Sequence, residues 1–408
     1  MQVATEGMPS QVKDRSALRV ALVVSAAHAA NDMYASFVPP LLPRIMGELG
    51  LSITLAATLA VAFSVAAALP QPFFGFIADR YGRRELAVLG PVVSGVFVSA
   101  IAWATGFWSL LLLLIIGGVG SAAFHPPGAS YAVRVSQGRG GGARYSVFSF
   151  GGSVGFALGP LFAVWLAQTK GMEGLWLAAI PVLIVAPLVY LGLPSERHEA
   201  FAADRTRPAA PTEVLRQLKG PLGLLFGVSA VMAFVQRTFQ TMTPIIVAEN
   251  GGPEILGAVA LTVYFSAQAF GTVAGGLLSD RLNRRKLLAH LCFWALPAHA
   301  FAVWIGPAGT VGLVAASLAG FLGMATLPPI VVMAQEMIPN GTAASSGVVM
   351  GLAWATGALG VLGTGMLADA IGAQPATLGS FPIALIAVFL ALHPSLEKTK
   401  AVEGASTA

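Results

Sequence analysis

Charged side chains are scarce in this chain of 408 residues. Asp, Glu, Lys and Arg make up only 10% of the sequence, whereas 56% of the residues are hydrophobic and the mean hydropathy is +0.77. A soluble domain carries about 25% charged residues, so this chain has too few to cover a water-facing surface. We therefore expect an integral membrane protein whose outer surface faces lipid.

Cysteine is also nearly absent. Cys292 is the single cysteine, so an intrachain disulfide and every metal site built from several thiolates are excluded. The sequence shows no ATP-binding domain, no serine in a nucleophile elbow and no intramembrane cluster of His, Asp and Glu with metal-ligand spacing. We therefore expect no enzyme, no catalytic residue, no metal and no cofactor.

Long apolar runs are abundant, and each is long enough to cross a bilayer, which takes about 20 residues. They fall near 19–42, 53–78, 86–105, 108–134, 144–168, 174–193, 220–248, 254–279, 287–306, 310–337, 344–368 and 376–394. One long polar segment separates the first six from the last six. This pattern predicts an all-α membrane protein with twelve transmembrane helices in two six-helix halves, 1–194 and 220–394. A linker, 195–219, joins the halves, and a tail, 395–408, follows them.

The basic residues are distributed very unevenly between the two sides of this arrangement. If the N-terminus is cytoplasmic, 20 of the 23 Lys and Arg residues lie on the cytoplasmic side and two lie outside. Such an excess is the positive-inside signal. It places both termini and the linker in the cytoplasm and indicates a multi-pass protein of the cell inner (plasma) membrane. Because the basic residues follow the topology, the net charge of +5 gives no reason to expect nucleic acid.

A ten-residue stretch is repeated in the two halves. GFIADRYGRR begins at Gly75 and recurs as GLLSDRLNRR, which begins at Gly276, with five identical residues at the same spacing. Both copies close the second span of their half. Arginines alone would anchor a turn at the lipid headgroups, but the acid within each copy predicts a conformational gate. We assign to this gate Gly75, Asp79, Arg80, Arg83, Arg84, Arg134, Asp280 and Arg281.

Asp79 is expected to form the closing contact on the cytoplasmic side. It lies between spans two and three, and Arg134 ends span four on the same face. We expect Asp79 to pair with Arg134, or to cap a helix N-terminus of the second half, when the cytoplasmic side is closed.

Paired prolines occur at matching positions of the fourth span in each half. AFHPPGA contains Pro126 and Pro127, and TLPPIV contains Pro328 and Pro329, 202 residues later. Prolines interrupt the helical hydrogen-bond ladder, and interrupted helices in corresponding positions of two halves point to a central binding site. Two packing kinks are the alternative interpretation.

These features together resemble the major facilitator superfamily. The resemblance rests on the twelve spans, the six-plus-six repeat, the long central linker and GxxxDRxGRR, and it covers essentially the whole chain. The glycine-rich GGSVGFALGP, which begins at Gly151, is similar to the family's antiporter motif. HAANDMY, GVGSAAFHPPGAS and FSFGGSVGFALGPL are similar to fosmidomycin-resistance-type exporters. Those proteins usually carry a glutamate after FHP, where this chain has Pro127.

The polar group formed by His28, Asn31 and Asp32 interrupts the first apolar run. A charge at the centre of a membrane helix costs roughly 2.5 to 3.5 kcal/mol, so we expect these residues to have a function. His28 is four residues before Asp32, which places both on one face of a helix. The resemblance implies that spans one, four, seven and ten line a central cavity, which adds His125.

Arg237 is the one arginine inside a predicted span, at a depth close to that of Asp32. A pair between Asp32 and Arg237 that forms in one conformation and breaks in the other would change the protonation of Asp32. A permanent structural pair is the alternative. Arg237 also suits an anionic substrate, because a guanidinium matches phosphonate, phosphate and carboxylate groups.

We accordingly assign roles to six polar residues of the spans. The expected proton-coupling residues are Asp32, His28 and His125. The expected substrate-binding residues are Arg237, Asn31, His125 and Gln240.

The sequence thus predicts a proton-coupled exporter of small anionic or amphiphilic compounds that works by alternating access. The alternative is a proton-coupled importer of an organic anion. The expected partners are the small-molecule substrate, protons and the lipid bilayer, with no nucleic acid, and the expected state is a monomer.

Overall fold

The computed structural model of the chain describes residues 10–135, 141–194, 216–338 and 345–397. Eleven helical segments in this part of the chain are long and apolar enough to cross a membrane. The helix before them, α1 (Ser10–Ala35), brings the number to the predicted twelve. It is less apolar than the others because it carries His28, Asn31 and Asp32 within its span.

The described part of the first half contains ten helical elements. They are α1, α2 (Val38–Leu49), α3 (Ile53–Ala68), α4 (Gln71–Tyr81), α5 (Arg83–Ser99), η1 (Ala100–Trp103), α6 (Phe107–Val135), α7 (Gly141–Lys170), η2 (Met172–Ala178) and α8 (Ala179–Gly192). The predicted spans near 53–78, 86–105, 108–134, 144–168 and 174–193 agree with the observed ones to within a few residues. Helix α1 ends where Ser36 donates to the Met33 carbonyl and two prolines begin α2.

The second half has the same number of membrane spans among its described residues. Its elements are α10 (Pro221–Glu249), α11 (Glu254–Arg281), α12 (Arg284–Ile305), α13 (Gly309–Ala325), α14 (Leu327–Met337), η5 (Gly347–Leu352), α16 (Ala353–Ile371), α17 (Ala373–Ser380), η6 (Phe381–Ile383), α18 (Ala384–Ala391) and η7 (Pro394–Leu396). The linker expected at 195–219 lies outside the described residues as far as residue 215, and its boundaries stay a prediction.

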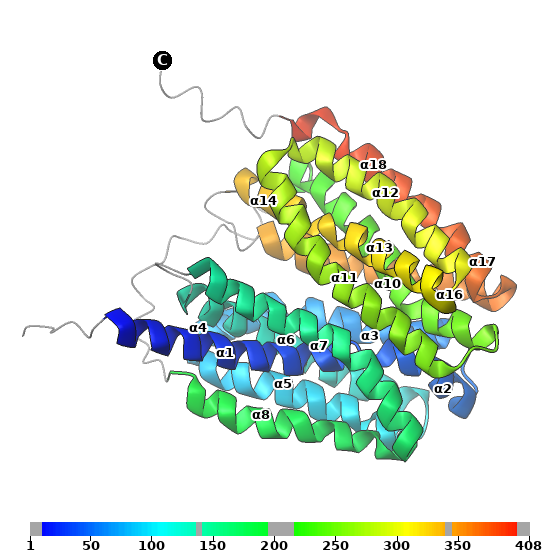
Figure 1. Ribbon diagram of the computed structural model, residues 1–408, viewed down its shortest axis with the longest axis horizontal. Helices are drawn as coiled ribbons and strands as arrows, with labels where there is room; N and C mark the ends of the chain where they lie inside the picture. The colour runs from blue at the N-terminus through cyan, green and yellow to red at the C-terminus, as the bar shows by residue number, and fades with distance from the viewer. Residues whose placement is uncertain (1–9, 136–140, 195–215, 339–344, 398–408) are drawn as a thin grey trace, which may run out of the picture.

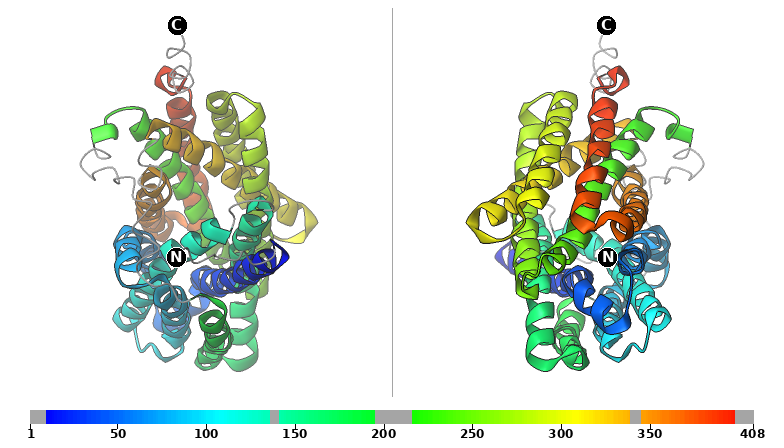
Figure 2. Two further views of the ribbon diagram at one scale, coloured as in Figure 1. Left: turned by 90° about the vertical axis from the view of Figure 1, so that its left-hand side faces the viewer. Right: turned by 90° about the vertical axis from the view of Figure 1, so that its right-hand side faces the viewer.

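The two halves lie against each other as separate helix groups. In the end-on views of Figure 2 the blue-to-green helices of the first half lie below the yellow-to-red helices of the second. The chain enters α1 and leaves α18 at the same end of the molecule, which is on the left in Figure 1. We call this the termini end. The opposite end, where α2 and α17 lie, is called the far end.

The paired prolines interrupt only one of the two matching helices. In the second half α13 ends at Ala325 and α14 begins at Leu327, as predicted. In the first half the prediction of a break was wrong, because α6 continues through Pro126 and Pro127. The Thr326 hydroxyl donates to the Gly323 carbonyl at 2.7 Å and so satisfies the helix end. The residue equivalent to Thr326 in the first half is a phenylalanine, which offers no hydroxyl for such an end.

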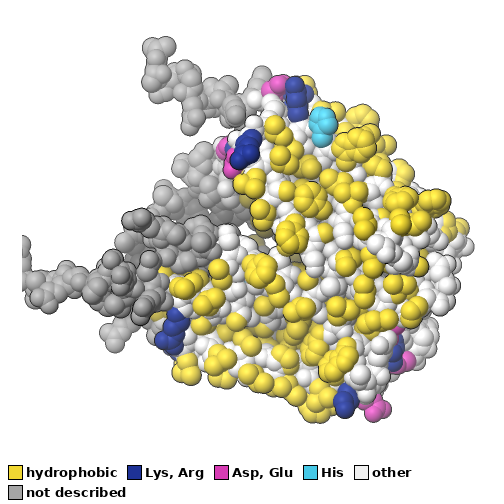
Figure 3. All heavy atoms as spheres, in the orientation of Figure 1, with side chains coloured by type: hydrophobic (Ala, Val, Ile, Leu, Met, Phe, Trp, Pro, Cys, Tyr) yellow, Lys and Arg dark blue, Asp and Glu magenta, His cyan; other side chains and the backbone are white. Residues whose placement is uncertain are grey.

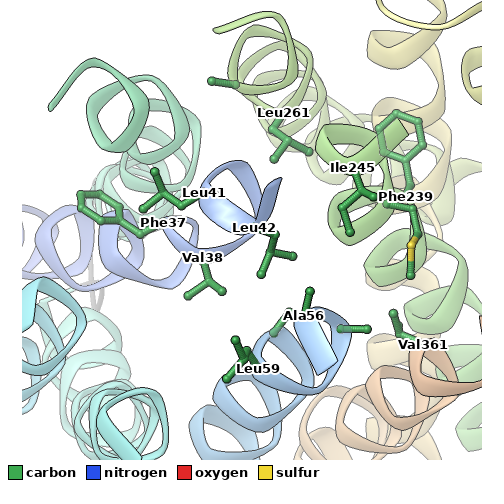
Figure 4. Close-up of a cluster of buried hydrophobic side chains, with 14 of the residues drawn as sticks. Phe37, Val38, Leu41, Leu42, Ala56, Leu59, Phe239, Ile245, Leu261 and Val361 are labelled. Atoms are coloured by element: carbon green, nitrogen blue, oxygen red, sulfur yellow. The ribbon is translucent and has the colours of Figure 1, made fainter. Parts of the chain in front are cut away.

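A hydrophobic cluster joins the halves toward the far end (Figure 4). The first half contributes side chains from α2, the residue before it and α3, and the second half contributes side chains from α10, α11 and α16. The labelled members are Phe37, Val38, Leu41, Leu42, Ala56, Leu59, Phe239, Ile245, Leu261 and Val361. Each of them is almost fully buried, so the far end is sealed in this conformation.

Polar contacts reinforce this seal. Arg44 of α2 donates two hydrogen bonds to Glu254 at the start of α11, at 3.1 and 2.7 Å. Asp369 near the end of α16 accepts hydrogen bonds from the backbone amides of Ile53 and Thr54, at 2.7 and 3.2 Å. Asp369 therefore caps the N-terminus of α3 from the other half, a position that favours a negative charge. The hydrogen bonds from Arg44 to Glu254 raise the pKa of Arg44 above its usual value, so the guanidinium remains charged.

The surface agrees with a lipid-facing protein. On the face shown in Figure 3, hydrophobic side chains cover the middle, and the visible charged side chains lie toward its ends. Large apolar side chains such as Trp108, Leu191, Phe270 and Phe389 are more than two thirds exposed. Such a surface would aggregate in water and is suited to a bilayer.

We predict that reversing one charge of the far-end contact opens the seal. Arg44→Glu places two acids opposite each other. A cysteine introduced at the buried Ile245 in a Cys292→Ala background should then react with a thiol reagent on the order of fivefold faster, equivalent to about 1 kcal/mol. The double variant Arg44→Glu with Glu254→Arg should restore the slow rate. Equal rates in all three proteins would show that this ion pair does not hold the far end closed.

Candidate functional site

His28, Asp32 and His125 form a compact cluster around a buried carboxylate in the first half. His28 and Asp32 lie one turn apart on α1, and their Nε2 and Oδ2 atoms are 3.1 Å apart. Helix α6 brings the Nε2 atom of His125 to 3.7 Å from the other oxygen of Asp32. The Asp32 side chain is only 5% exposed, whereas that of His125 is 30% exposed. The predicted common face of His28 and Asp32 and the approach of His125 from span four are both present.

Asn31 completes the surroundings of the carboxylate. Its side-chain amide donates to Asp32 Oδ1 and to the hydroxyl of Ser121 on α6, each at 3.0 Å. The same amide nitrogen is 3.5 Å from His125 Nε2. Asn31 was predicted from the sequence, whereas Ser121 was not, since one serine in an apolar run gives no sequence signal.

Helix α7 fixes the orientation of His28. The Nδ1 atom of His28 lies 3.0 Å from the Phe148 carbonyl, and the Phe148 ring stacks on the imidazole with centroids 4.3 Å apart. A carbonyl only accepts hydrogen bonds, so Nδ1 carries the proton in this contact. In the neutral ring Nε2 is then free to accept a proton, and it faces Asp32.

One expectation from the sequence was wrong. No His, Asp and Glu cluster with metal-ligand spacing was expected in the spans, yet the ligand atoms of His28, Asp32 and His125 all lie within 4.8 Å of one another. The sequence could not reveal this because His125 comes from another helix. Among the described residues, Asn31 donates to one oxygen of Asp32 and His28 Nε2 lies 3.1 Å from the other, whereas the buried Oδ1 of Asn31 has no hydrogen-bond partner.

A second polar group lies on the opposite half, around Arg237 of α10. Arg237 donates to Gln240 Oε1 at 3.1 Å, and its guanidinium lies 5.4 Å from the ring centroid of Trp354 on α16, a cation–π distance. Within the described part of the chain its buried Nε has no hydrogen-bond partner. Arg237 and Gln240 were predicted from the sequence, whereas Trp354 was not.

Asp32 and Arg237 do not form an ion pair in this conformation. The partners of Asp32 among the described residues are His28, His125 and Asn31. The expected pair between the two halves therefore stays a prediction for a different conformation.

Further polar side chains of the second half were not anticipated. Gln268 of α11 donates to Gln236 at 2.7 Å, and the buried hydroxyl of Tyr264 lies 3.1 Å from His299 Nε2. The other nitrogen of His299 lies 2.7 Å from the Ala295 carbonyl. His299 Nδ1 thus donates to the Ala295 carbonyl and Nε2 accepts a hydrogen bond from the Tyr264 hydroxyl, so both ring nitrogens are satisfied within the core.

The repeated motif lies at the termini end of both halves. Arg84 donates to the Tyr190 carbonyl and lies 3.7 Å from its ring centroid, which ties α5 to α8. The second copy ties α12 to α14 by an ion pair between Arg284 and Glu336.

The structure describes some of the other residues assigned to the gate. A methyl group on Gly75 would lie 3.6 Å from Pro126, so α4 packs on α6 at this residue. Asp280 and Arg281 end α11 and are exposed. The side chain of Asp79 lies outside the described residues, and its predicted contact with Arg134 is untested.

Comparison with known proteins decides the family. The sequence profile of the Major Facilitator Superfamily matches residues 24–358, which is most of the chain. The chain belongs to the major facilitator superfamily. Together with the fold, this membership identifies a multi-pass membrane transporter and gives no indication of an enzyme.

Several curated members of the superfamily are similar over much of this transporter. An uncharacterized MFS-type transporter, YfnC of Bacillus subtilis (strain 168), is 25% identical, with 93% of this chain and 94% of the relative covered. The fosmidomycin resistance protein of Escherichia coli (strain K12) is 27% identical, with 88% and 89% covered. The multi-drug resistance efflux pump PmrA of Streptococcus pneumoniae serotype 4 is 24% identical, with 64% and 67% covered.

Solved structures share the fold of this transporter. A bacterial homolog of the human lysosomal transporter Spinster, in an inward-facing and occupied conformation, superposes with a TM-score of 0.77. It is 17% identical, with 95% of this chain and 97% of that chain covered. The nucleoside transporter NupG, solved as a point mutant, has a TM-score of 0.75 at 13% identity, with 92% and 99% covered. At these identities the likeness concerns the fold alone.

Proposed function

We propose that this transporter is a proton-coupled exporter of small anionic or amphiphilic compounds that works by alternating access. The observation that carries the proposal is the separation of two polar groups on opposite halves. The buried cluster of Asp32, His28 and His125 is suited to protons, and Arg237 is suited to an anion. The relatives that are a fosmidomycin resistance protein and a multi-drug efflux pump favour export over import.

The orientation in the membrane follows from the basic residues. They place the termini end in the cytoplasm of a cell whose inner membrane holds the protein. The sealed far end is then the external side, and the structure represents an inward-facing conformation. The solved Spinster homolog, which is inward-facing, has a closely similar fold.

The proton is exchanged at the carboxylate of Asp32. Two imidazoles lie within 3.7 Å of this carboxylate, and each Nε2 can hold the proton that Asp32 gives up. A proton that enters from outside converts the carboxylate to the neutral acid, and its release toward the cytoplasm restores the charge. His125 is the more exposed of the two histidines, so it provides the path between Asp32 and the cavity.

The anionic group of the substrate binds to Arg237. Its guanidinium has five N–H donors in a planar fork, and the hydrogen bond to Gln240 fixes the plane of this fork. Nε and the remaining donors stay available for a carboxylate or phosphonate, which the fork binds through two hydrogen bonds. Trp354 adds an apolar face for an amphiphilic compound.

Competition for Arg237 links the two events. In the inward-facing conformation Asp32 interacts with its histidines and Arg237 is open to the substrate. When the halves rock so that the cytoplasmic side closes, Arg237 approaches Asp32. A charged Asp32 then takes Arg237 from the substrate anion, and the anion leaves to the outside. A proton from outside then neutralises Asp32, which breaks the pair and allows the halves to rock back. Each substrate anion moved outward is thereby exchanged for an inward proton.

We predict that Asp32→Asn abolishes uphill transport but retains exchange. Asparagine resembles the protonated acid permanently, so rocking continues without net proton transfer. The measurement compares pH-driven accumulation with counterflow of labelled fosmidomycin, or of another anionic compound that the wild type moves, in proteoliposomes. Glu397→Gln, at an exposed carboxylate far from the cluster, is the control and should behave as wild type. Uphill transport by a well-folded Asp32→Asn protein would exclude Asp32 as the coupling residue.

We predict that Arg237→Lys transports poorly although it keeps the charge. The planar fork is lost, and one charge-assisted hydrogen bond contributes about 1.5 to 3 kcal/mol, so the Michaelis constant should rise at least about tenfold. Arg285→Lys, where a single ion pair to Glu397 is retained, is the control. Full rescue by lysine would reduce Arg237 to a counter-ion, and wild-type activity of Arg237→Ala would remove both roles.

A further inference from the structure

Helix α7 lies unusually close to α1 along a face of glycines. A methyl group built on Gly155 would lie 2.2 Å from the Ala29 carbonyl oxygen, and one on Gly151 would lie 2.3 Å from the Ser25 carbonyl oxygen. At both glycines the α1 backbone is what the methyl group would strike. These two glycines allow the backbones of α1 and α7 to approach closely, as small residues do between membrane helices.

Gly152 differs from its neighbours because it faces the polar cluster itself. A methyl group there would lie 2.5 Å from Cε1 and 2.6 Å from Nε2 of His28, and 2.8 Å from Oδ2 of Asp32. Side-chain carbons do not occur at such distances from other atoms, so any residue larger than glycine must displace the imidazole or the carboxylate. Because Gly152 has no side chain, there is room beside it for the contact between Nε2 of His28 and Oδ2 of Asp32.

Phe148 contacts the same imidazole from one turn earlier in α7. Its carbonyl accepts the Nδ1 proton, and its ring stacks on the imidazole at 20° between planes. The carbonyl fixes the tautomer, the ring fixes the plane, and Gly152 leaves the opposite edge open. One helix thus determines the position of both ring nitrogens.

We propose that Gly152 and Phe148 are positioning residues for proton coupling: α7 sets the tautomer and the position of His28 so that Nε2 exchanges protons with Asp32. This inference rests on the proposed function, because it assigns the control of the same cluster. Gly152 touches neither the proton nor the substrate and acts only through the imidazole and the carboxylate.

The other ionisable groups near this pair come from two further helices. Among the described residues, His125 of α6 acts on Asp32 directly, and Arg237 of α10 acts on it through space. The contacts of α7 with the pair come from a carbonyl, an aromatic ring and a glycine, none of which ionises. A change at Gly152 therefore alters the pH response only by moving the pair.

A double-mutant cycle tests the proposal. The variants Gly152→Ala, His28→Ala and their combination are purified, and their unfolding temperatures are measured together with the pH profile of transport. Gly155→Ala, alone and with His28→Ala, is the matched control, because its methyl group meets the α1 backbone and not the imidazole.

The expected result is specific to the pair. Gly152→Ala should lower the unfolding temperature and shift the pH midpoint of transport away from the wild-type value. In the His28→Ala background it should have little further effect, since the imidazole it strikes is gone. Gly155→Ala should lower the unfolding temperature equally with and without His28 and leave the pH midpoint unchanged. If the Gly152→Ala protein does not fold, the test is whether adding His28→Ala restores folding. Restored folding would show that the alanine acts by striking the imidazole.

Three outcomes would overturn the proposal. They are a Gly152→Ala protein with the wild-type pH midpoint, an equal loss of stability with and without His28, and a shift of the pH midpoint by Gly155→Ala of the same size. If the wild type responds to pH and Asp32→Asn removes that response, such outcomes reject the role of α7 and leave the proposed function intact.

Discussion

The burial of one carboxylate is the constraint on which this structure depends. Asp32 lies among apolar helices, where an isolated charge would cost several kcal/mol. The cost is offset by two histidines and an asparagine, which surround both carboxylate oxygens. These partners come from α1 and α6, and α7 holds one of them in place. Three helices of the first half must therefore keep a fixed geometry for the charge to be tolerated.

Among the described residues, the second half carries a positive charge near this carboxylate but forms no ion pair with it in this conformation. Arg237 of α10 donates to Gln240 and lies against the ring of Trp354. It forms no ion pair with Asp32 in this conformation, in which the far end is sealed. Helix α7 connects the two halves in another way, since Thr262 of α11 donates to the Ala157 carbonyl nine residues after Phe148. The helix that contacts His28 is thus also packed against the second half.

Much of this could be predicted from the sequence because membrane spans impose strong local rules. Length and apolarity predicted the boundaries of eleven spans to within a few residues. The first span was predicted at 19–42, but α1 begins at Ser10 and ends at Ala35, before the prolines that begin α2. The polar residues His28, Asp32 and Arg237 were found because each is costly in an apolar run. Spacing on a single helix also predicted the contact between His28 and Asp32, which lie one turn apart.

What the sequence did not reveal depends on contacts between helices. Ser121 and Trp354 are ordinary residues of apolar runs, and only packing brings them to Asn31 and Arg237. The break expected at Pro126 did not occur, and α6 has a phenylalanine where the broken helix of the second half has Thr326, whose hydroxyl satisfies the helix end. The far-end contact between Arg44 and Glu254 joins residues 210 apart in the chain, and neither lies in a motif.

Proton movement coupled to substrate movement tests the central claim most directly. Purified protein is reconstituted in vesicles with a pH-sensitive dye inside, and an anionic compound that the protein transports is added outside, starting from a panel that includes fosmidomycin. The account predicts that the vesicle interior becomes more alkaline as the compound enters, because each anion is exchanged for a proton, and that Asp32→Asn shows entry without this change. Acidification of the interior with compound entry, or entry by the wild type with no proton movement, would contradict it.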